Sequence, residues 1–494
     1  MRKRYYKLVF FYLSIFIALI GIIQLLPLLV IPFYPEDIAY AKCFLIPGIA
    51  ACVIGTLMYH FLKDTEVTKL EHYYDSVLVI LIWTCAINIS TIPWMLKGDY
   101  NFSQAAFEMT SGFSTTGLSV VDVENTPKIF LMFRSITLFF GGVGLVLIMT
   151  SAFSDRYGLN LYNAEGHSDR LMPNLAKSAR LILSFYSAYI FCGSLAYVLA
   201  GMPVFDAFNT AIAAISTGGF SVINESIYGY HSVAIEMITI VLMLLGQTNF
   251  MLHMSLFKRR FRKVFMHCET RFFAAVALIF VPLMAFDLLH MEYTGDILES
   301  LRIALFQFVT TITTTGFVSV KDMGMLPPGF VTFMILAMLI GGNQESTGGG
   351  IKQYRVIVVL LGIFYSLRES IMNAHMFVTH KVWRFGNKED LERREVSATS
   401  TYVLFYILLF FLGSLIFSMY GYSLQDSMFE FASAISTVGL SLGITGYDAS
   451  PVILWTGIVG MFLGRMEIMV VFKAIMRMLK DANNREGTSI RTNI

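Results

Sequence analysis

The chain alternates long apolar stretches with short polar ones along its whole length. Ten stretches are apolar over about 20 residues, the length that a helix needs to cross the hydrocarbon core of a bilayer. They lie near residues 7–32, 41–62, 75–95, 128–152, 179–200, 232–256, 272–291, 329–366, 400–420 and 451–478. The pattern predicts an all-α integral membrane protein with ten spanning segments. The first segment follows a basic start and is expected to be retained rather than cleaved.

Polar tracts rich in Ser, Thr and Gly interrupt this pattern at four places, after the third, fifth, seventh and ninth stretches. The tracts are FSTTGLSVVD from Phe113, ISTGGFSVIN from Ile215, ITTTGFVSVKD from Ile312 and ISTVGLSLGIT from Ile435. Each follows an amphipathic segment of about ten residues, which is too short to cross the membrane and is expected to form a half-helix. Each also has one aligned glycine; these are Gly117, Gly219, Gly316 and Gly439.

The aligned glycines recur about every 100 to 120 residues, which predicts four homologous units of helix, half-helix, polar loop and helix. Two extra spanning helices in residues 1–66 come before these units. We place the units, with the five central residues of each tract in parentheses, at residues 67–168 (Ser114–Leu118), 169–264 (Ser216–Phe220), 265–385 (Thr313–Phe317) and 386–494 (Ser436–Leu440). The expected fold is four M1–pore loop–M2 repeats around a pseudo-fourfold pore, plus the two N-terminal transmembrane helices. The glycine-rich residues 341–352 are expected to break the eighth stretch.

Composition and charge agree with a membrane location. Of the 494 residues, 56% are hydrophobic and only 14% are charged, and the formal net charge is +2. Lys and Arg concentrate in alternate loops, which predicts that both termini are cytoplasmic. The basic run from Phe257 to Lys263 is explained by this rule or by anionic lipid head groups, and a docking surface for a regulatory subunit is a third interpretation. The five cysteines have no C-x-x-C spacing, so no disulfide framework and no metal site is predicted.

The four polar tracts predict a cation site. Irregular backbone at membrane depth must be buried in protein or line a cavity, because an unpaired amide in hydrocarbon costs several kcal/mol. Rings of backbone carbonyls suit a dehydrated cation, and half-helices that point their C-terminal ends inward favour a cation too. The tracts contain no ring of Asp or Glu, so a monovalent cation is expected, with K⁺ and Na⁺ both open. Close packing of small residues explains one such tract but not four.

The tracts resemble those of the Trk/Ktr/HKT superfamily of K⁺ transporters, and the resemblance covers essentially the whole chain. Three further motifs carry it: NFMLH (Asn249–His253), GGNQESTGGGIK (Gly341–Lys352) and GRMEI (Gly464–Ile468). The two extra N-terminal spans are similar to those of TrkH/TrkG-type potassium uptake subunits. The resemblance implies a multi-pass protein of the bacterial inner membrane that takes up K⁺ as a symporter or channel-like protein. It also implies a homodimer regulated by a cytosolic nucleotide-binding subunit of the TrkA type.

Carried over position by position, the resemblance implies that the four polar tracts together form an ion-selectivity filter. The backbone of this filter is implied to bind K⁺ beside the four aligned glycines. The binding positions are Thr115, Thr116, Thr217, Gly218, Thr314, Thr315, Thr437 and Val438. Glycine at all four aligned positions implies K⁺ rather than Na⁺. The loop at residues 341–352 is implied to be a gate below the filter. The gate residues implied by the resemblance are Gly348, Gly349, Gly350 and Glu345 in this loop, and Arg465 in the GRMEI motif.

The gate loop departs from the family pattern, which has small residues where this chain has Asn343, Gln344 and Glu345. A buried Glu345 needs a partner, and Arg465 is the candidate. A structural pair of Arg465 with Glu467 or with backbone carbonyls is the alternative. His253 is interpreted as a satisfied core histidine.

Three rival functions are compatible with a polytopic chain. The first is a poorly selective K⁺/Na⁺ translocating subunit of the same fold. The second is a secondary transporter, but such proteins commonly show inverted repeats, whereas these units share one orientation. The third is a membrane enzyme, for which the sequence offers no clustered His, Cys or carboxylate motif. We therefore expect no enzymatic activity, no organic cofactor and no nucleic-acid partner. The expected ligand is K⁺, and the protein is expected to be surrounded by membrane lipid.

Overall fold

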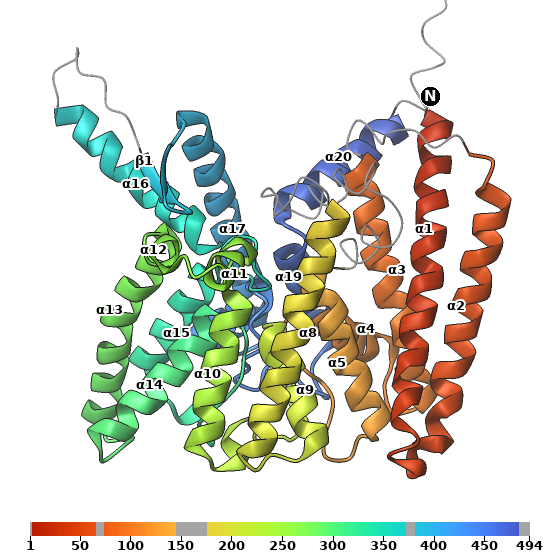
Figure 1. Cartoon of the computed structure of the whole chain (residues 1–494), viewed down its shortest axis with the longest axis horizontal. Coiled ribbons are helices and arrows are strands. Elements are labelled where there is room, and N and C mark those ends of the chain that lie inside the picture. Colours follow the sequence, from red (N-terminus) through yellow and green to blue (C-terminus); the bar gives the residue numbers. More distant parts are fainter. Residues whose placement is uncertain (1, 66–73, 145–174, 372–380, 484–494) are drawn as a thin grey trace, which may run out of the picture. The chain divides into compact units, whose positions relative to one another are not determined.

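The computed structural model describes the chain except for residues 1, 66–73, 145–174, 372–380 and 484–494, and it confirms the expected all-α membrane fold (Figure 1). The strands that it describes are β1 (Lys381–Arg384) and β2 (Asn387–Asp390), an antiparallel pair. The chain divides into two compact units, and each is described by itself. The first comprises residues 1–113, 125–184 and 466–494, and the second comprises residues 114–124 and 185–465.

The first unit contains the two N-terminal helices and the elements that lead to the first polar tract. Its helices are α1 (Arg2–Leu25), α2 (Ala41–Leu62), α3 (Tyr74–Lys97), α4 (Phe102–Phe113), α5 (Lys128–Val143) and α20 (Ile468–Asn483), with the 3-10 turns η1 (Leu26–Val30) and η2 (Pro35–Tyr40). Small residues let the backbones of α1 and α2 approach closely. A Cβ atom at Gly55 would lie 2.5 Å from the amide nitrogen of Ala18, so a larger residue there would separate the two helices.

The half-helix α4 is fixed to α5 by a buried ion pair. Arg134 Nε donates to Glu108 Oε1 at 2.7 Å, and the two side chains are only 3% and 1% exposed. Each charge compensates the other where neither is solvated, so loss of one partner alone would leave an uncompensated buried charge.

The helix α20 is held to α3 through Tyr74, which is fully buried. The Tyr74 hydroxyl donates to Asp481 Oδ2 at 2.9 Å and accepts from Arg477 Nη2 at 2.8 Å. Arg477 also pairs with Asp481 at 3.1 Å and lies over the Tyr74 ring, 4.5 Å from its centroid. One aromatic side chain therefore organises the charged groups that anchor α20.

The second unit contains all four polar tracts and most of the remaining helices. α8 (Leu175–Leu199) enters it from the first unit. The helices that follow are α9 (Val204–Ile215), α10 (Val233–Gln247), α11 (Phe250–Phe257), α12 (Phe261–Phe265), α13 (Cys268–His290), α14 (Ile297–Ile312), α15 (Pro328–Ile340), α16 (Gln353–Ile371), α17 (Arg393–Met419), α18 (Leu424–Ile435) and α19 (Pro451–Arg465), with the 3-10 turns η3 (Tyr228–Tyr230) and η4 (Met323–Met325). The hairpin β1–β2 buries Val382, and Leu391 just after it, against Tyr354 and Val358 of α16.

Six of the described helices are long and apolar enough to cross a membrane: α1, α2, α3, α8, α13 and α17. They correspond to the first, second, third, fifth, seventh and ninth stretches of the sequence. A seventh span is counted if the bent pair α10 and α11 is taken as one crossing. The multi-pass character expected from hydropathy is confirmed.

The even-numbered stretches from the fourth onward are not the continuous helices that their hydropathy predicts. α5 ends at Val143, before Gly144 with φ +92°, and residues 145–152 lie outside the described residues. α10 and α11 meet at an angle of 111°. α15 and α16 are separated by residues 341–352, as expected, but the break between α19 and α20 was not expected. Hydropathy misses such a break because a single polar side chain can set it. Asn249 Oδ1 accepts the Met251 N–H at 2.8 Å and so starts α11 anew.

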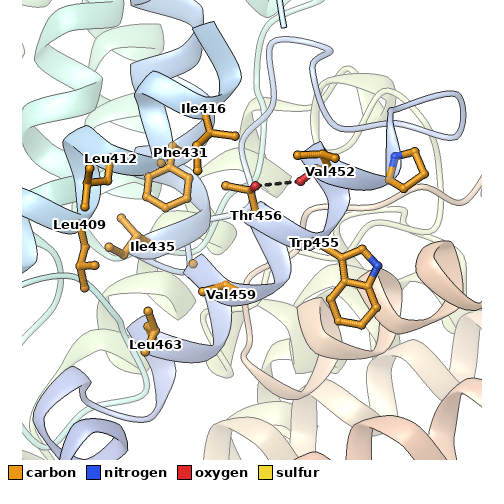
Figure 2. A pocket seen from close by; sticks show the side chains of 13 residues that line it. Leu409, Leu412, Ile416, Phe431, Ile435, Val452, Trp455, Thr456, Val459 and Leu463 are labelled. Carbon is orange, nitrogen blue, oxygen red and sulfur yellow. Dashed lines mark hydrogen bonds between the residues drawn. The ribbon is translucent and has the colours of Figure 1, made fainter. Parts of the chain in front are cut away.

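An apolar pocket of about 450 Å³ lies between α17, α18 and α19 (Figure 2). Its walls include Leu412, Phe431, Trp455 and Val459, and the hydroxyl of Thr456 in it already donates to the Val452 carbonyl at 2.7 Å. Apolar walls cannot replace the hydration shell of an ion, so this pocket is not a candidate cation site.

We expect Tyr74→Phe to loosen α20. The substitution leaves Asp481 and Arg477 each with one partner fewer, and a buried hydrogen bond to a charged group contributes about 1.5–3 kcal/mol. The melting temperature of the detergent-solubilised protein should fall, and trypsin should cleave faster after Arg477 and Lys480. Tyr59→Phe on α2, where the side chain is 45% exposed, is the control. Equal melting and cleavage in both variants would contradict the anchoring role.

Candidate cation-binding site

The four polar tracts have the same local structure. Each follows a short helix that ends four residues before the aligned glycine: α4 ends at Phe113, α9 at Ile215, α14 at Ile312 and α18 at Ile435. The residues of the tracts are almost completely buried, with Thr115, Thr217 and Thr314 at 0% and Thr437 at 1% exposure. Four segments far apart in the sequence therefore present equivalent backbone in the interior of the second unit.

Each tract has positive φ at two positions separated by one residue. The first is a threonine: Thr115 (φ +55°), Thr217 (+52°), Thr314 (+54°) and Thr437 (+53°). The second is the aligned glycine: Gly117 (+99°), Gly219 (+58°), Gly316 (+88°) and Gly439 (+98°). Positive φ is unfavourable for a β-branched residue, so its recurrence at four equivalent positions marks strain that the surrounding structure maintains.

Amide groups of the second, third and fourth tracts point back toward the preceding helices. Gly218 N donates to the Ala213 carbonyl at 2.9 Å, and Val438 N donates to the Ser433 carbonyl at 2.8 Å. Thr315 N donates to the Thr310 carbonyl at 2.9 Å in the same manner. Since the N–H groups are paired on that side, the backbone carbonyls of these residues are left for the opposite side.

The tracts meet in a closed ring. A Cβ atom at Gly117 would lie 2.5 Å from the carbonyl oxygen of Gly218, in the second tract. A Cβ atom at each other aligned glycine would overlap the carbonyl oxygen of the next tract: Gly219 with Thr315, Gly316 with Val438, and Gly439 with Thr116. Only glycine fits at these positions, because each packs directly against a neighbouring carbonyl.

The carbonyl oxygens in this ring lack hydrogen-bond donors. Within the described part of the chain, no donor is bound to the carbonyls of Thr116, Gly218, Thr315 or Val438. Buried carbonyls without donors are costly, and a monovalent cation stripped of its water is a ligand that such a ring satisfies. The geometry is thus suited to the ion that the sequence predicts, while the binding roles of the eight backbone positions stay a prediction.

The loop at residues 341–352 lies against the first residues of three tracts. The Thr347 hydroxyl is 3.0 Å from that of Thr217, and Gly349 N donates to Thr314 Oγ1 at 2.7 Å. A Cβ atom at Gly349 would overlap the carbonyl of Ser436, the first residue of the fourth tract. The glycines of the loop are therefore needed for its close approach to the tracts, and Gly350 also has φ +80°.

Two basic side chains bind carbonyls of this loop. Arg465 Nη1 donates to the Thr347 carbonyl at 3.2 Å, and the Lys352 ammonium donates to the Gly348 carbonyl. Glu345, which is 7% exposed and has φ +56°, lies in the same loop. The contact of Arg465 with a backbone carbonyl agrees with one of the two alternatives for this residue, and its pairing with Glu345 stays a prediction. Lys352 was missed, although an ionisable residue within an apolar stretch is a signal in itself.

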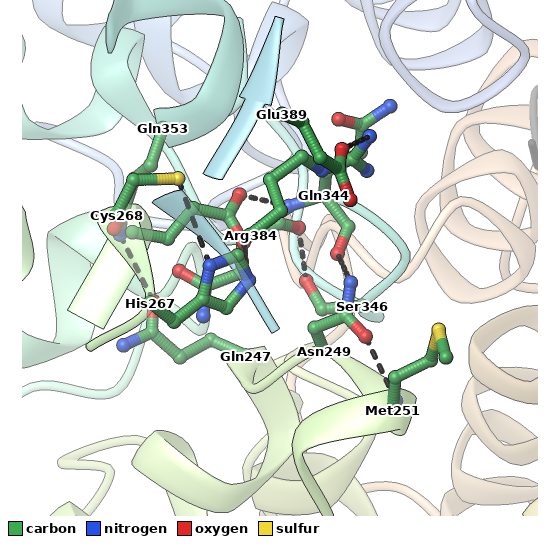
Figure 3. Close-up of polar contacts among 12 residues, drawn as sticks. Gln247, Asn249, Met251, His267, Cys268, Gln344, Ser346, Gln353, Arg384 and Glu389 are labelled. Atoms are coloured by element: carbon green, nitrogen blue, oxygen red, sulfur yellow. Dashed lines mark hydrogen bonds and ion pairs between the residues drawn. The ribbon is translucent and has the colours of Figure 1, made fainter. Parts of the chain in front are cut away.

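The residues that depart from the family pattern are held by neighbouring helices (Figure 3). Asn249 Nδ2 donates to the Gln344 carbonyl at 2.8 Å, and Gln344 N donates to Glu269 Oε1 at 2.7 Å. Gln353 Nε2 contacts Gln247 Oε1 at 3.3 Å and the Gly341 carbonyl at 3.2 Å. These contacts connect the loop with α10, α11, α13 and α16 through its backbone groups. The buried side-chain oxygens Asn343 Oδ1 and Gln344 Oε1 have no hydrogen-bond partner among the described residues.

The histidine next to Glu269 is neutral at physiological pH. Burial, together with the nearby Arg384 guanidinium, lowers the pKa of His267 to about 4. The contact of 3.4 Å between His267 Nε2 and Glu269 Oε2 is therefore not an ion pair at neutral pH. His253 is also satisfied, since its Nδ1 accepts from the Tyr189 hydroxyl at 3.0 Å and its Nε2 donates to the Leu245 carbonyl at 3.0 Å.

We expect Thr314→Val to loosen the loop at residues 341–352. The substitution keeps the shape of the side chain but removes the acceptor of the Gly349 N–H, a bond that contributes about 1 kcal/mol. Hydrogen–deuterium exchange of peptides that cover residues 341–352 should become faster. Thr332→Val, whose hydroxyl is exposed and donates within its own helix α15, is the control. Unchanged exchange in Thr314→Val would show that this bond does not hold the loop.

Comparison with known proteins gives consistent matches over nearly the whole chain. The family model TrkH, described as cation transport protein, matches residues 41–486. An uncharacterized cation transporter of Methanocaldococcus jannaschii is 30% identical over 459 residues, which is 92% of each chain. The Trk system potassium uptake protein TrkH of Salmonella typhimurium is 28% identical over 85% of this chain and 88% of its own.

Two further matches are a second Trk system protein and a solved structure. The Trk system potassium uptake protein TrkG of Escherichia coli is 27% identical over 90% of this chain and 92% of its own. The crystal structure of the potassium transporter TrkH from Vibrio parahaemolyticus has a TM-score of 0.83 at 24% identity and covers 94% of this chain and 98% of that one. At 24% identity the structural match establishes the fold alone. The family is established by the family model and by the sequence matches. The chain belongs to the TrkH family of cation transport proteins, and it is a transporter rather than an enzyme.

Proposed function

We propose that this protein takes up K⁺ across the bacterial inner membrane through the ring of carbonyls that its four polar tracts form. The observation that carries the proposal is the closed ring in which each aligned glycine abuts a carbonyl oxygen of the next tract. A ring of carbonyls replaces the water around a cation without a fixed negative charge, which suits a monovalent ion. Relatives named as potassium uptake proteins support K⁺ as that ion.

In this proposal the bound K⁺ is coordinated by backbone at the eight filter positions. These are Thr115, Thr116, Thr217, Gly218, Thr314, Thr315, Thr437 and Val438. The membrane potential supplies about 2.3 kcal/mol per charge for every 100 mV, which drives uptake without a nucleotide site on this chain. The alternative is a poorly selective K⁺/Na⁺ translocating subunit of the same fold, and it differs in the flux ratio of the two ions.

The loop at residues 341–352 is the gate in this proposal. Its contacts with Thr217 and Thr314, which belong to the proposed filter tracts, support this role. Lys352 and Arg465 bring two positive charges to its carbonyls, and a cation leaving the filter is repelled by them. Conduction then requires the loop and these charges to move together, with Gly348, Gly349 and Gly350 allowing the change in backbone.

We extend the proposal to assembly and topology on the strength of family membership. The protein is a homodimer, and a cytosolic TrkA-type nucleotide-binding subunit moves the gate. Both termini are cytoplasmic, as the distribution of Lys and Arg predicts. The four repeats occupy residues 67–168, 169–264, 265–385 and 386–494, and the basic residues between Phe257 and Lys263 meet anionic lipid.

We expect Gly316→Ser to abolish K⁺ selectivity or K⁺ flux. A side chain at this position overlaps the Val438 carbonyl, so the ring must open or distort. Growth at limiting K⁺ in a bacterial strain without its own K⁺ uptake should fail, as it should with Gly117→Ser. Gly295→Ser is the matched control, because a Cβ atom there meets nothing within 4 Å. Normal growth of the Gly316 variant at limiting K⁺ would exclude this position from the filter.

We expect Arg465→Ala to speed K⁺ flux. The substitution removes one of the two charges from the gate and releases the Thr347 carbonyl. Flux from proteoliposomes under a K⁺ gradient measures this, with Arg465→Lys retaining the charge. Arg393→Ala serves as control, since the Arg393 side chain is 82% exposed and far from the loop in sequence. Flux no faster than that of the unmodified protein would reject the barrier role.

A further inference from the structure

A buried carboxylate lies beside the fourth filter tract and belongs neither to the filter nor to the gate. Glu430 is in the middle of α18, nine residues before Gly439, and its side chain is 0% exposed. A fully buried carboxylate is costly unless its oxygens are bound by donors or paired with a cation. The donors that bind the Glu430 carboxylate therefore indicate its role.

Within the part of the chain that the structure describes, every donor to Glu430 comes from the five residues after Leu440, at the end of the fourth tract. Ser441 Oγ donates to Oε1 at 2.7 Å, and Leu442 N donates to Oε2 at 2.9 Å. Thr445 donates to Oε1 twice, from its amide nitrogen at 3.0 Å and from its hydroxyl. One carboxylate thus fixes the segment from Ser441 to Thr445, in which the chain leads away from the proposed filter.

The same helix also fixes the tract on the other side of this carboxylate. Ser433, one turn after Glu430, accepts the Val438 N–H on its carbonyl at 2.8 Å and the Gly439 N–H on its hydroxyl at 3.0 Å. Glu430 and Ser433 together hold the tract just before and just after the aligned glycine. The position of the Val438 carbonyl in the ring depends on both.

The equivalent position differs among the repeats. Nine residues before the other aligned glycines stand Glu108, Thr210 and Gln307. Glu108 is paired with Arg134 at 2.7 Å, and Gln307 Nε2 contacts Ser319 Oγ at 3.4 Å. Among the described residues no Lys, Arg or His pairs with Glu430, so this carboxylate is compensated by hydrogen bonds alone.

We propose that Glu430 is a positioning residue that sets the preference for K⁺ over Na⁺ by fixing the fourth filter tract. This inference rests on the proposed function. A carbonyl ring favours the larger ion only while it resists closing around the smaller one. Four hydrogen bonds to one carboxyl group supply that resistance at the Val438 side of the ring, since together they tie the chain that follows Gly439 to α18, the helix that precedes it.

The decisive variant is Glu430→Gln, which keeps the size of the side chain. Glutamine has one acceptor oxygen and one NH₂ donor, so either orientation turns a donor toward the N–H of Leu442 or of Thr445. We expect the ratio of K⁺ to Na⁺ flux in proteoliposomes to fall by about tenfold or more, the effect of losing one hydrogen bond to a charged group. Thr445→Val, which removes one hydroxyl donor, should lower the ratio less.

The control is Asp426→Asn, the same change of charge on the same helix. Asp426 is hydrogen-bonded to Ser423 at the exposed start of α18, and its variant should keep the flux ratio of the unmodified protein. Monodispersity and melting temperature report on folding. If Glu430→Gln does not fold, Thr445→Val decides the question: a lowered ratio supports the proposal and an unchanged ratio overturns it.

Failure of this inference differs from failure of the proposed function. If the unmodified protein conducts no K⁺, the proposed function fails and the inference falls with it. If the unmodified protein prefers K⁺ and Glu430→Gln has the same preference, the inference alone is overturned. A merely structural role predicts that both fluxes fall together at constant ratio, and that result also overturns it.

Discussion

The structure depends on one constraint: backbone that leaves the helix inside a membrane protein must find partners for its carbonyl groups. The second, third and fourth tracts turn amides toward the preceding helices, so their carbonyls are left on the other side. A threonine and a glycine with positive φ in each tract produce this arrangement. Since no donor among the described residues binds the ring of carbonyls, the cation that we propose would stabilise the fold as well as carry the function.

The same constraint explains the environment of the ring. Because each aligned glycine packs against a carbonyl of the next tract, the tracts cannot shift one at a time. They are held from behind by α9, α14 and α18 and approached by the loop at residues 341–352, whose Gly349 N–H binds Thr314. Strain at Thr217, Thr314 and Thr437 is thus maintained by contacts on several sides. If the loop at residues 341–352 is the gate that we propose, its contacts with Thr217 and Thr314 let it act on the proposed filter directly.

Sequence reasoning predicted what depends on local composition and repetition. The aligned glycines, the short helices before them and the break at residues 341–352 all follow from spacing and residue type. It missed features set by contacts between distant segments. The positive φ of Thr437, the bond from Lys352 to Gly348 and the anchoring of Ser441–Thr445 by Glu430 involve residue types that are common elsewhere in the chain. The bend at Asn249 was also missed, because an apolar stretch hides a single capping residue.

The central claim is that the ring of carbonyls binds a dehydrated monovalent cation. The most direct measurement is a crystal structure of the purified protein in Rb⁺ or Tl⁺, which replace K⁺ and give an anomalous signal. The account predicts a peak on the axis enclosed by the carbonyl oxygens of Thr116, Gly218, Thr315 and Val438, weakened by competing K⁺. A ring without a peak, or a peak that only Na⁺ displaces, would contradict it.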